Sequence, residues 1–112
     1  MDLTKKHCVP CEGGMPPLTD GKENGMLKLV QHGNGWILLR DGNHKIHRQF
    51  KFKDFKDAMS FVNKVAEVAN AEDHHPDIKI AYNKVQLDLS THAVGGLSKN
   101  DFILAAKINK LL

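Results

Sequence analysis

The chain has 112 residues, of which 41% are hydrophobic and 26% charged, and its formal net charge is +3. This length and composition are typical of one globular domain, and the small positive charge does not support direct binding to nucleic acid. No apolar run reaches the roughly 20 residues that span a bilayer, and residues 1–6 lack the apolar core of a signal peptide. Two cysteines are too few for a disulfide scaffold. We therefore expect a cytoplasmic protein without membrane contacts.

The first part of the chain is rich in glycine and proline. We therefore predict an extended arm over residues 1–17 and a single domain over residues 18–112. Leu18 and Thr19 have the pattern of a hydrophobic staple and an N-cap. They predict a short helix, followed by a turn at residues 32–35. The apolar face of this helix carries Met26, Leu27 and Val30.

Two strands joined by a tight turn are predicted next. Residues 36–40 form a mostly apolar run, and the following Asp41-Gly42-Asn43 is a hairpin signal. Residues 45–52 alternate in polarity, which indicates a strand with one face in the core. The core-facing residues are Ile46, Arg48, Phe50 and Phe52, and the opposite face carries Lys45, His47, Gln49 and Lys51.

A long helix is predicted to begin after Asp54, which has the chemistry of an N-cap, and to end near Asn70. Apolar residues recur along it at helical spacing and predict a buried face. These residues are Phe55, Ala58, Met59, Val62, Val65, Ala66 and Ala69.

Another hairpin follows, with its turn predicted at Asn83-Lys84. Ser98 and Asp101 then have the spacing of a capping box, and they begin a last amphipathic helix that reaches Leu112. The alternating apolar residues are Ile78, Ile80 and Tyr82 in the first strand and Val85, Leu87 and Leu89 in the second. The apolar residues of the helix include Phe102, Ile103 and Ala106.

The predicted order is helix, two strands, helix, two strands, helix. Short links between paired strands imply an antiparallel sheet. We therefore predict an α+β fold in which a four-stranded antiparallel sheet has helices packed on one face. Its two edge strands could pair with another subunit.

Three histidines are predicted to meet at one end of the second hairpin. His74 and His75 stand before Pro76 and the hairpin's first strand, and His92 follows its second strand. Because the start and the end of an antiparallel hairpin lie side by side, the three imidazoles should converge. Imidazole titrates near pH 6.5, so such a cluster can donate and accept protons at neutral pH.

Other interpretations stay open for these residues. Loop histidines can be merely exposed polar residues, and three histidines can bind zinc with an open fourth position, although no helical H-x-x-x-H pair is present. Cys8 and Cys11 form a lone C-x-x-C in the arm, which we interpret as two reduced thiols without a catalytic role, a metal shared between subunits being the alternative. The basic residues and phenylalanines of segment 40–56 could suggest nucleic acid, but they fit a solvated face and a core better.

Several short motifs occur in a characteristic order along the chain. They are Asp73-His74-His75-Pro76, Tyr82-Asn83-Lys84-Val85, Thr91-His92 and Gly95-Gly96-Leu97-Ser98-Lys99-Asn100-Asp101. The set resembles the pterin-4a-carbinolamine dehydratase family, closely over residues 34–112 and loosely over the first 33. The resemblance implies dehydration of 4a-hydroxytetrahydropterin to quinonoid dihydropterin, without a metal or organic cofactor. It also implies recycling of the pterin of aromatic amino-acid hydroxylases, the four-stranded fold, and a homodimer or homotetramer.

The resemblance also implies roles for single residues. His74 and His92 match histidines with acid/base roles, and His75 matches one that mainly holds the pterin. Pro76 and Asp101 match positions near the site, where Asp101 is expected to be structural because it is also a helix cap. The implied substrate-binding residues are Asp73, Ser90, Thr91, Trp36 and Asn70, of which Asn70 stands where the family commonly has an acidic residue.

An alternative function also follows from the resemblance. Some relatives act as dimerisation cofactors of a homeodomain transcription factor, so the fold could serve as a non-catalytic binding module. A pure scaffold has no reason to keep His74, His75 and His92, and this chain has all three. The sequence therefore favours the dehydratase.

Overall fold

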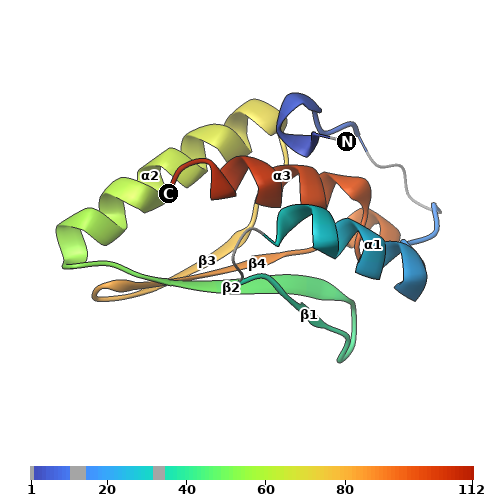
Figure 1. Ribbon diagram of the computed structural model, residues 1–112, viewed down its shortest axis with the longest axis horizontal. Coiled ribbons are helices and arrows are strands. Elements are labelled where there is room, and N and C mark those ends of the chain that lie inside the picture. The colour runs from blue at the N-terminus through green and yellow to red at the C-terminus, as the bar shows by residue number, and fades with distance from the viewer. Residues whose placement is uncertain (1, 11–14, 32–34) are drawn as a thin grey trace.

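The computed structural model describes residues 2–10, 15–31 and 35–112. Within these ranges the helices and strands follow the predicted order, and Figure 1 shows the three α-helices on one face of the sheet. The predicted α+β fold is therefore confirmed. The elements are η1 (Leu3–Lys5), α1 (Asp20–Val30), β1 (Ile37–Leu39), β2 (Lys45–Lys51), α2 (Phe55–Glu72), β3 (Asp77–Ala81), β4 (Lys84–Leu89), η2 (His92–Val94) and α3 (Lys99–Asn109).

The four strands form one antiparallel sheet in the order β1-β2-β4-β3. Each predicted hairpin is present, and the two hairpins join through β2 and β4, which pair from Ile46 with Leu89 to Lys51 with Lys84. In the second hairpin Asp77 at the start of β3 pairs with Asp88 near the end of β4. This register places the segment before β3 beside the segment after β4.

Helix α3 is the centre of the helical layer. It contacts both α1 and α2 as well as η1, and residues 100–106 and Ile108 are buried. The helix was expected to be amphipathic, but it is covered on nearly all sides because α1, α2 and the sheet enclose it. Beneath it the core-facing side chains of the sheet are fully or almost fully buried: Ile46, Phe50, Val85, Leu87 and Leu89.

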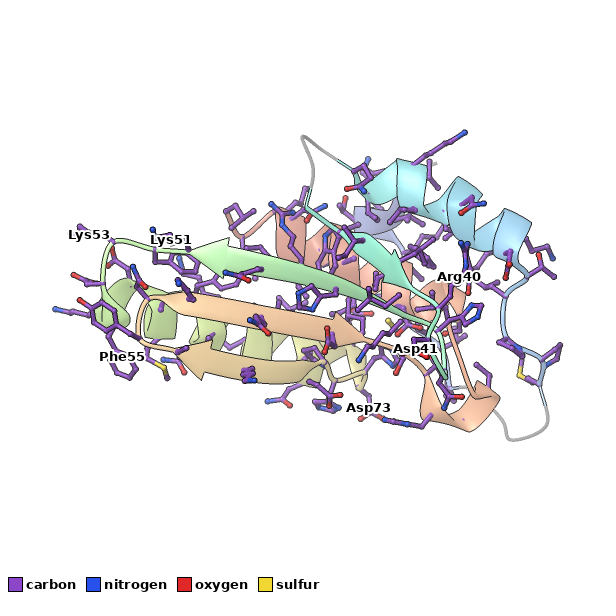
Figure 2. The ribbon with its side chains drawn as sticks, turned by 90° about the horizontal axis from the view of Figure 1, so that it is seen from below. Arg40, Asp41, Lys51, Lys53, Phe55 and Asp73 are labelled. Carbon is purple, nitrogen blue, oxygen red and sulfur yellow. The ribbon has the colours of Figure 1, made fainter. Side chains whose placement is uncertain are left out.

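Helix α2 begins after the predicted cap, whose Asp54 side chain accepts a hydrogen bond from the Asp57 backbone N–H, and it extends to Glu72. The prediction that Phe55 is buried is wrong, since this side chain is 50% exposed. Phe55 is the first residue of α2 and lies at the end of the molecule, where no other layer covers it (Figure 2). The buried aromatic residue is Phe61, whose ring centroid lies 4.7 Å from that of Phe50.

The second hairpin also corrects two expectations. Tyr82 was predicted to belong to a strand, but it lies in the turn with a left-handed φ of 53° and is 65% exposed. The turn is Tyr82-Asn83, one residue earlier than predicted, because Ala81 pairs with Lys84. Ile78 and Ile80 alternate as expected, yet they stay partly exposed on the edge strand β3.

The N-terminal arm is not wholly extended, because Leu3–Lys5 form a 3₁₀ helix. Leu3 is buried, and the Lys107 ammonium donates a hydrogen bond to the Thr4 carbonyl (3.3 Å). Cys11 and most of the predicted turn at residues 32–35 lie outside the described residues. Among the helices that the structure describes, none combines the length and the apolar character needed to cross a membrane.

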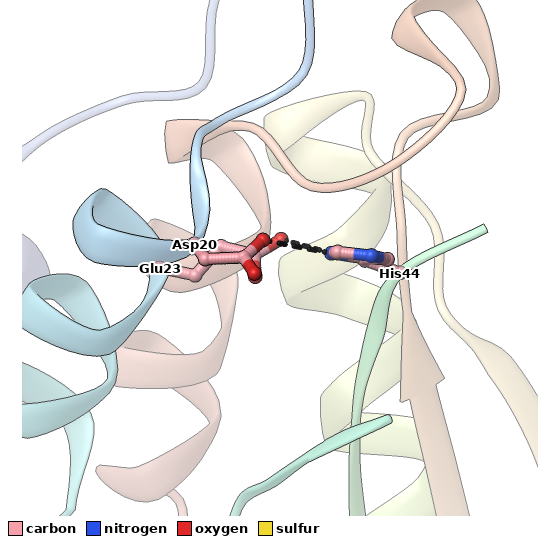
Figure 3. A group of neighbouring side chains, drawn as sticks. All are labelled: Asp20, Glu23 and His44. Atoms are coloured by element: carbon pink, nitrogen blue, oxygen red, sulfur yellow. Dashed lines mark hydrogen bonds and ion pairs between the residues drawn. The ribbon is translucent and has the colours of Figure 1, made fainter. Parts of the chain in front are cut away.

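A buried carboxylate ties the first hairpin to α1. Glu23 is fully buried and accepts hydrogen bonds from Arg40 Nε (3.0 Å) and from His44 Nδ1 (2.7 Å). Arg40 and His44 flank the turn between β1 and β2, and Figure 3 shows His44 facing Asp20 and Glu23. Asp20 lies nearby but is exposed, with its Oδ1 3.9 Å from Arg40 Nε. The guanidinium supplies the positive charge that a buried carboxylate needs, so this group holds the hairpin in place.

We expect Glu23→Ala to lower the free energy of unfolding by about 2–3 kcal/mol. Removing one partner of a fully buried ion pair costs about 3–5 kcal/mol, and the partly exposed Arg40 and His44 recover some solvation. Asp20→Ala is the matched control and should cost less than about 1 kcal/mol, because its contacts are long and exposed. Urea unfolding measures the loss of unfolding free energy in both variants. Equal losses would contradict this account.

Candidate active site

A cavity of about 400 Å³ lies where the second hairpin meets the end of α2 and the start of α3. Residues 72–75, residues 90–93, Asn100 and residues 8–10 of the arm line it. His74, His75 and His92 are all among them, as the hairpin geometry predicts. The pairing of Asp77 with Asp88 brings these segments together from either side of the hairpin.

His74 is oriented by a buried carboxylate. Its Nε2 lies 2.6 Å from Oδ1 of Asp101, which is fully buried. The other carboxylate oxygen of Asp101 accepts hydrogen bonds from the Thr91 hydroxyl (2.8 Å) and from the Ser98 backbone N–H (2.9 Å). Because an ionised carboxylate only accepts, His74 carries a proton on Nε2 and Nδ1 is the nitrogen available to a ligand.

Asp101 therefore has two functions in this arrangement. The predicted capping box is present, with Ser98 and Asp101 exchanging hydrogen bonds at the start of α3. The same carboxylate also fixes the ring of His74, so its structural role and its role at the site cannot be separated. The Thr91 hydroxyl, 2.8 Å from the Ser98 hydroxyl, completes a buried network behind the cavity.

The other two histidines are held more loosely. His75 Nε2 lies 3.0 Å from the Asn70 side-chain oxygen, so the Asn70 amide orients the ring of His75. Asn70 itself is not among the residues lining the cavity. His92 belongs to the short helix η2 and is exposed at the cavity, and within the described part of the chain its ring has no hydrogen-bond partner.

The remaining predicted site residues divide into two groups. Asp73, Ser90 and Thr91 line the cavity, with Asp73 ending α2 in a left-handed conformation (φ 52°). Trp36 does not reach it, because this side chain is fully buried and its Nε1 donates to Asn109 Oδ1 (2.8 Å). Its expected contact with substrate thus has no support from the geometry.

Pro76 follows the cavity residues and directly precedes β3. The distances between possible ligand atoms do not favour zinc binding by the three histidines. Among the described residues, the group whose possible ligand atoms lie within 4.8 Å of one another is Asp20, Glu23 and His44, where Arg40 already supplies positive charge.

Sequence reasoning missed the contribution of the arm and of two polar side chains. Cys8, Val9 and Pro10 line the cavity together with Glu72 and Asn100. The arm was predicted to be a segment outside the domain, and no arm residue was assigned to the site. A local signal existed, since Glu72 and Asn100 directly precede the site residues Asp73 and Asp101.

Comparisons with known proteins identify a family that this chain resembles over most of its length. Residues 16–111 match the family model described as pterin 4 alpha carbinolamine dehydratase. A Halorhodospira halophila protein named as a pterin-4-alpha-carbinolamine dehydratase is 50% identical to this chain over 111 residues. The aligned region covers 99% of this chain and 98% of that protein. A protein of Nitrosomonas eutropha with the same name is 47% identical, covering 99% and 94%.

Solved structures are also similar to this chain. A Brucella melitensis protein described as a transcriptional coactivator/pterin dehydratase has a TM-score of 0.77 and 36% identity, covering 85% of this chain and 97% of its own. A pterin dehydratase-like protein described as a RuBisCO assembly factor of the alpha-carboxysome has a TM-score of 0.61. At 17% identity, with 71% of this chain and 92% of that chain covered, it shows a shared fold alone.

The thiol of Cys8 forms part of the cavity wall but is unsuited to chemistry. Burial, together with the negative charges of Glu72 and Asp101, raises its pKa from 9.0 to about 12. Only the thiolate is a nucleophile or a good metal ligand, so Cys8 stays a neutral thiol at physiological pH. This supports the interpretation of Cys8 as a thiol without a catalytic role.

We expect iodoacetamide to alkylate Cys8 slowly at pH 8. A rise of about three pKa units lowers the thiolate fraction roughly 1,000-fold. The measurement uses Cys11→Ser protein so that Cys8 is the single thiol, and the same variant unfolded in urea is the control. Equal alkylation rates for the folded and unfolded chains would contradict the pKa shift.

Proposed function

The chain belongs to the pterin 4 alpha carbinolamine dehydratase family, and we propose that it is a hydro-lyase that converts 4a-hydroxytetrahydropterin to quinonoid dihydropterin and water at this cavity. One observation carries the proposal: His74, His75 and His92 line a single cavity, and the buried Asp101 fixes the ring of His74. Imidazoles are suited to this reaction because it consists of proton transfers.

The elimination needs one acid and one base. The base removes the proton from N5, the electrons of that N–H bond form the double bond between N5 and C4a, and the bond between C4a and the hydroxyl oxygen breaks. The acid delivers a proton to the departing oxygen, which leaves as water. The step is redox-neutral and balanced by proton transfers, so we propose that no cofactor takes part.

His74 and His92 are the proposed acid/base pair. The hydrogen bond to Asp101 leaves Nδ1 of His74 facing no protein partner among the described residues, so that nitrogen can exchange a proton with substrate. His92 is exposed at the same cavity and can exchange protons with water as well. We assign His75, Asp73 and Ser90 to binding of the polar edges of the pterin.

The proposal also covers the fate of the product, the self-association of the chain and its location. The product would return to aromatic amino-acid hydroxylases through the recycling of their pterin, and we propose a homodimer or homotetramer in the cytoplasm. The edge strand β3 supports self-association, because Ile78 and Ile80 are partly exposed beside its unpaired backbone. The non-catalytic binding module is the alternative, and it gives no reason for three histidines in one cavity.

We expect His74→Ala and His92→Ala each to lower kcat for dehydration of synthetic 4a-hydroxytetrahydropterin by roughly 10²–10⁴-fold, the usual contribution of general acid–base catalysis. The control is His47→Ala, because His47 pairs with Asp88 on the sheet and does not line the cavity. If both cavity variants kept wild-type rates, the catalytic assignment would be wrong, and an inactive wild type would favour the binding module.

Asp101→Asn tests how His74 is held. The oxygen that accepts from Thr91 and Ser98 must stay an acceptor, so the new amide NH₂ would face His74. The histidine proton would then move to Nδ1, and the nitrogen available to substrate would change from acceptor to donor. We expect kcat to fall by about 10²-fold or more with an unchanged circular dichroism spectrum, whereas a normal kcat would show that the orientation of His74 is unimportant.

A further inference from the structure

We propose that residues 8–10 of the N-terminal arm are a wall of the active site that determines how tightly the pterin binds. The inference rests on the proposed function, because it concerns the same cavity. Cys8, Val9 and Pro10 line this cavity although they are more than 60 residues away in sequence from the histidines. The arm would act on binding, and the acid/base chemistry would belong to the histidines.

The first contact that holds the arm is Glu72, at the end of α2. One carboxylate oxygen accepts the Cys8 backbone N–H (2.7 Å), and the other lies 3.0 Å from His7 Nδ1 and 3.4 Å from the Lys107 ammonium. Burial opposes ionisation of Glu72, but these hydrogen bonds and the charge of Lys107 lower its pKa below the ordinary value. A charged carboxylate with three donors is a strong anchor for a backbone segment.

The second contact is Asn100, a buried residue in the first turn of α3. Its side-chain oxygen accepts the Val9 backbone N–H (3.0 Å), and its NH₂ donates to the Val9 carbonyl (2.6 Å). The amide thus satisfies both backbone polar groups of Val9, as a neighbouring strand would. In addition, the Cys8 thiol donates to the Asn100 carbonyl (3.5 Å).

The two residues that hold the arm, Glu72 and Asn100, are close in sequence to the site residues His74 and Asp101. Glu72 stands two residues before His74, and Asn100 stands directly before Asp101. The arm therefore joins the two helix ends that carry the His74–Asp101 hydrogen bond. A contact that served stability alone would not need to join these particular ends and to line the cavity as well.

The chemistry of the arm complements that of the other walls. Residues 73–75 and 90–92 offer carboxylate, imidazole and hydroxyl groups, whereas Val9 and Pro10 offer apolar side chains. A pterin has polar edges and apolar ring faces, so the polar walls fit the edges and the arm fits a ring face. Val9 is 65% exposed, so a pterin ring packed against it would remove apolar surface from water.

The test compares Val9→Ser with wild type in two assays, fluorescence titration with a stable 7,8-dihydropterin and steady-state dehydration. We expect Kd and KM to rise about 5- to 20-fold, as the loss of one apolar contact predicts, with kcat changed less than about 3-fold. Val9→Ile should restore both constants. Lys6→Ser, an exposed arm residue outside the cavity, is the matched control and should match wild type.

Each outcome is decisive. If Val9→Ser keeps wild-type Kd and KM, or lowers kcat alone, the arm is not a binding wall, and the proposed function still stands. If Lys6→Ser weakens binding as much as Val9→Ser, the effect belongs to the arm's stability and the inference fails. If wild type neither binds the dihydropterin nor dehydrates substrate, the proposed function itself is wrong.

Discussion

The arrangement of the site depends on one buried carboxylate, that of Asp101. Its two oxygens connect three parts of the chain: the start of α3, Thr91 after β4, and His74 after α2. A buried carboxylate is costly unless every oxygen is bonded, so these partners are held together by the need to satisfy it. The consequence is a histidine with a fixed ring and a defined tautomer, and a helix terminus that is part of the site.

The sheet brings these partners within reach of one another. The antiparallel pairing of β3 with β4 places the loop that holds His74 beside the loop that holds His92, and β2 secures the other side of β4. Helix α3 then lies across this layer, enclosed by α1, α2 and the sheet, so that its first turn meets both loops. The most deeply buried helix therefore carries the residue that orients His74.

The position of Asn70 shows how a local departure from the family pattern is accommodated. The family commonly has an acidic residue there, and in this chain the amide oxygen accepts a hydrogen bond from His75. An amide can orient an imidazole but adds no charge. The nearby carboxylate of Glu72 is used differently, since it anchors the N-terminal arm. Two residues in the last turn of α2 thus have separate tasks: Asn70 orients a histidine and Glu72 positions the arm.

The sequence by itself determined the order of helices and strands, the caps at Asp54 and Ser98, and the meeting of three histidines, because periodicity, capping and hairpin geometry are local rules. Only the tertiary structure decided burial and long-range contacts. Phe55 carries a perfect core pattern but lies beyond the other layers, and Trp36 is enclosed by the core away from the cavity. Glu72 and Asn100 stand beside predicted site residues, but their hydrogen bonds to the arm join segments that are distant in the sequence, and such contacts depend on how whole layers pack.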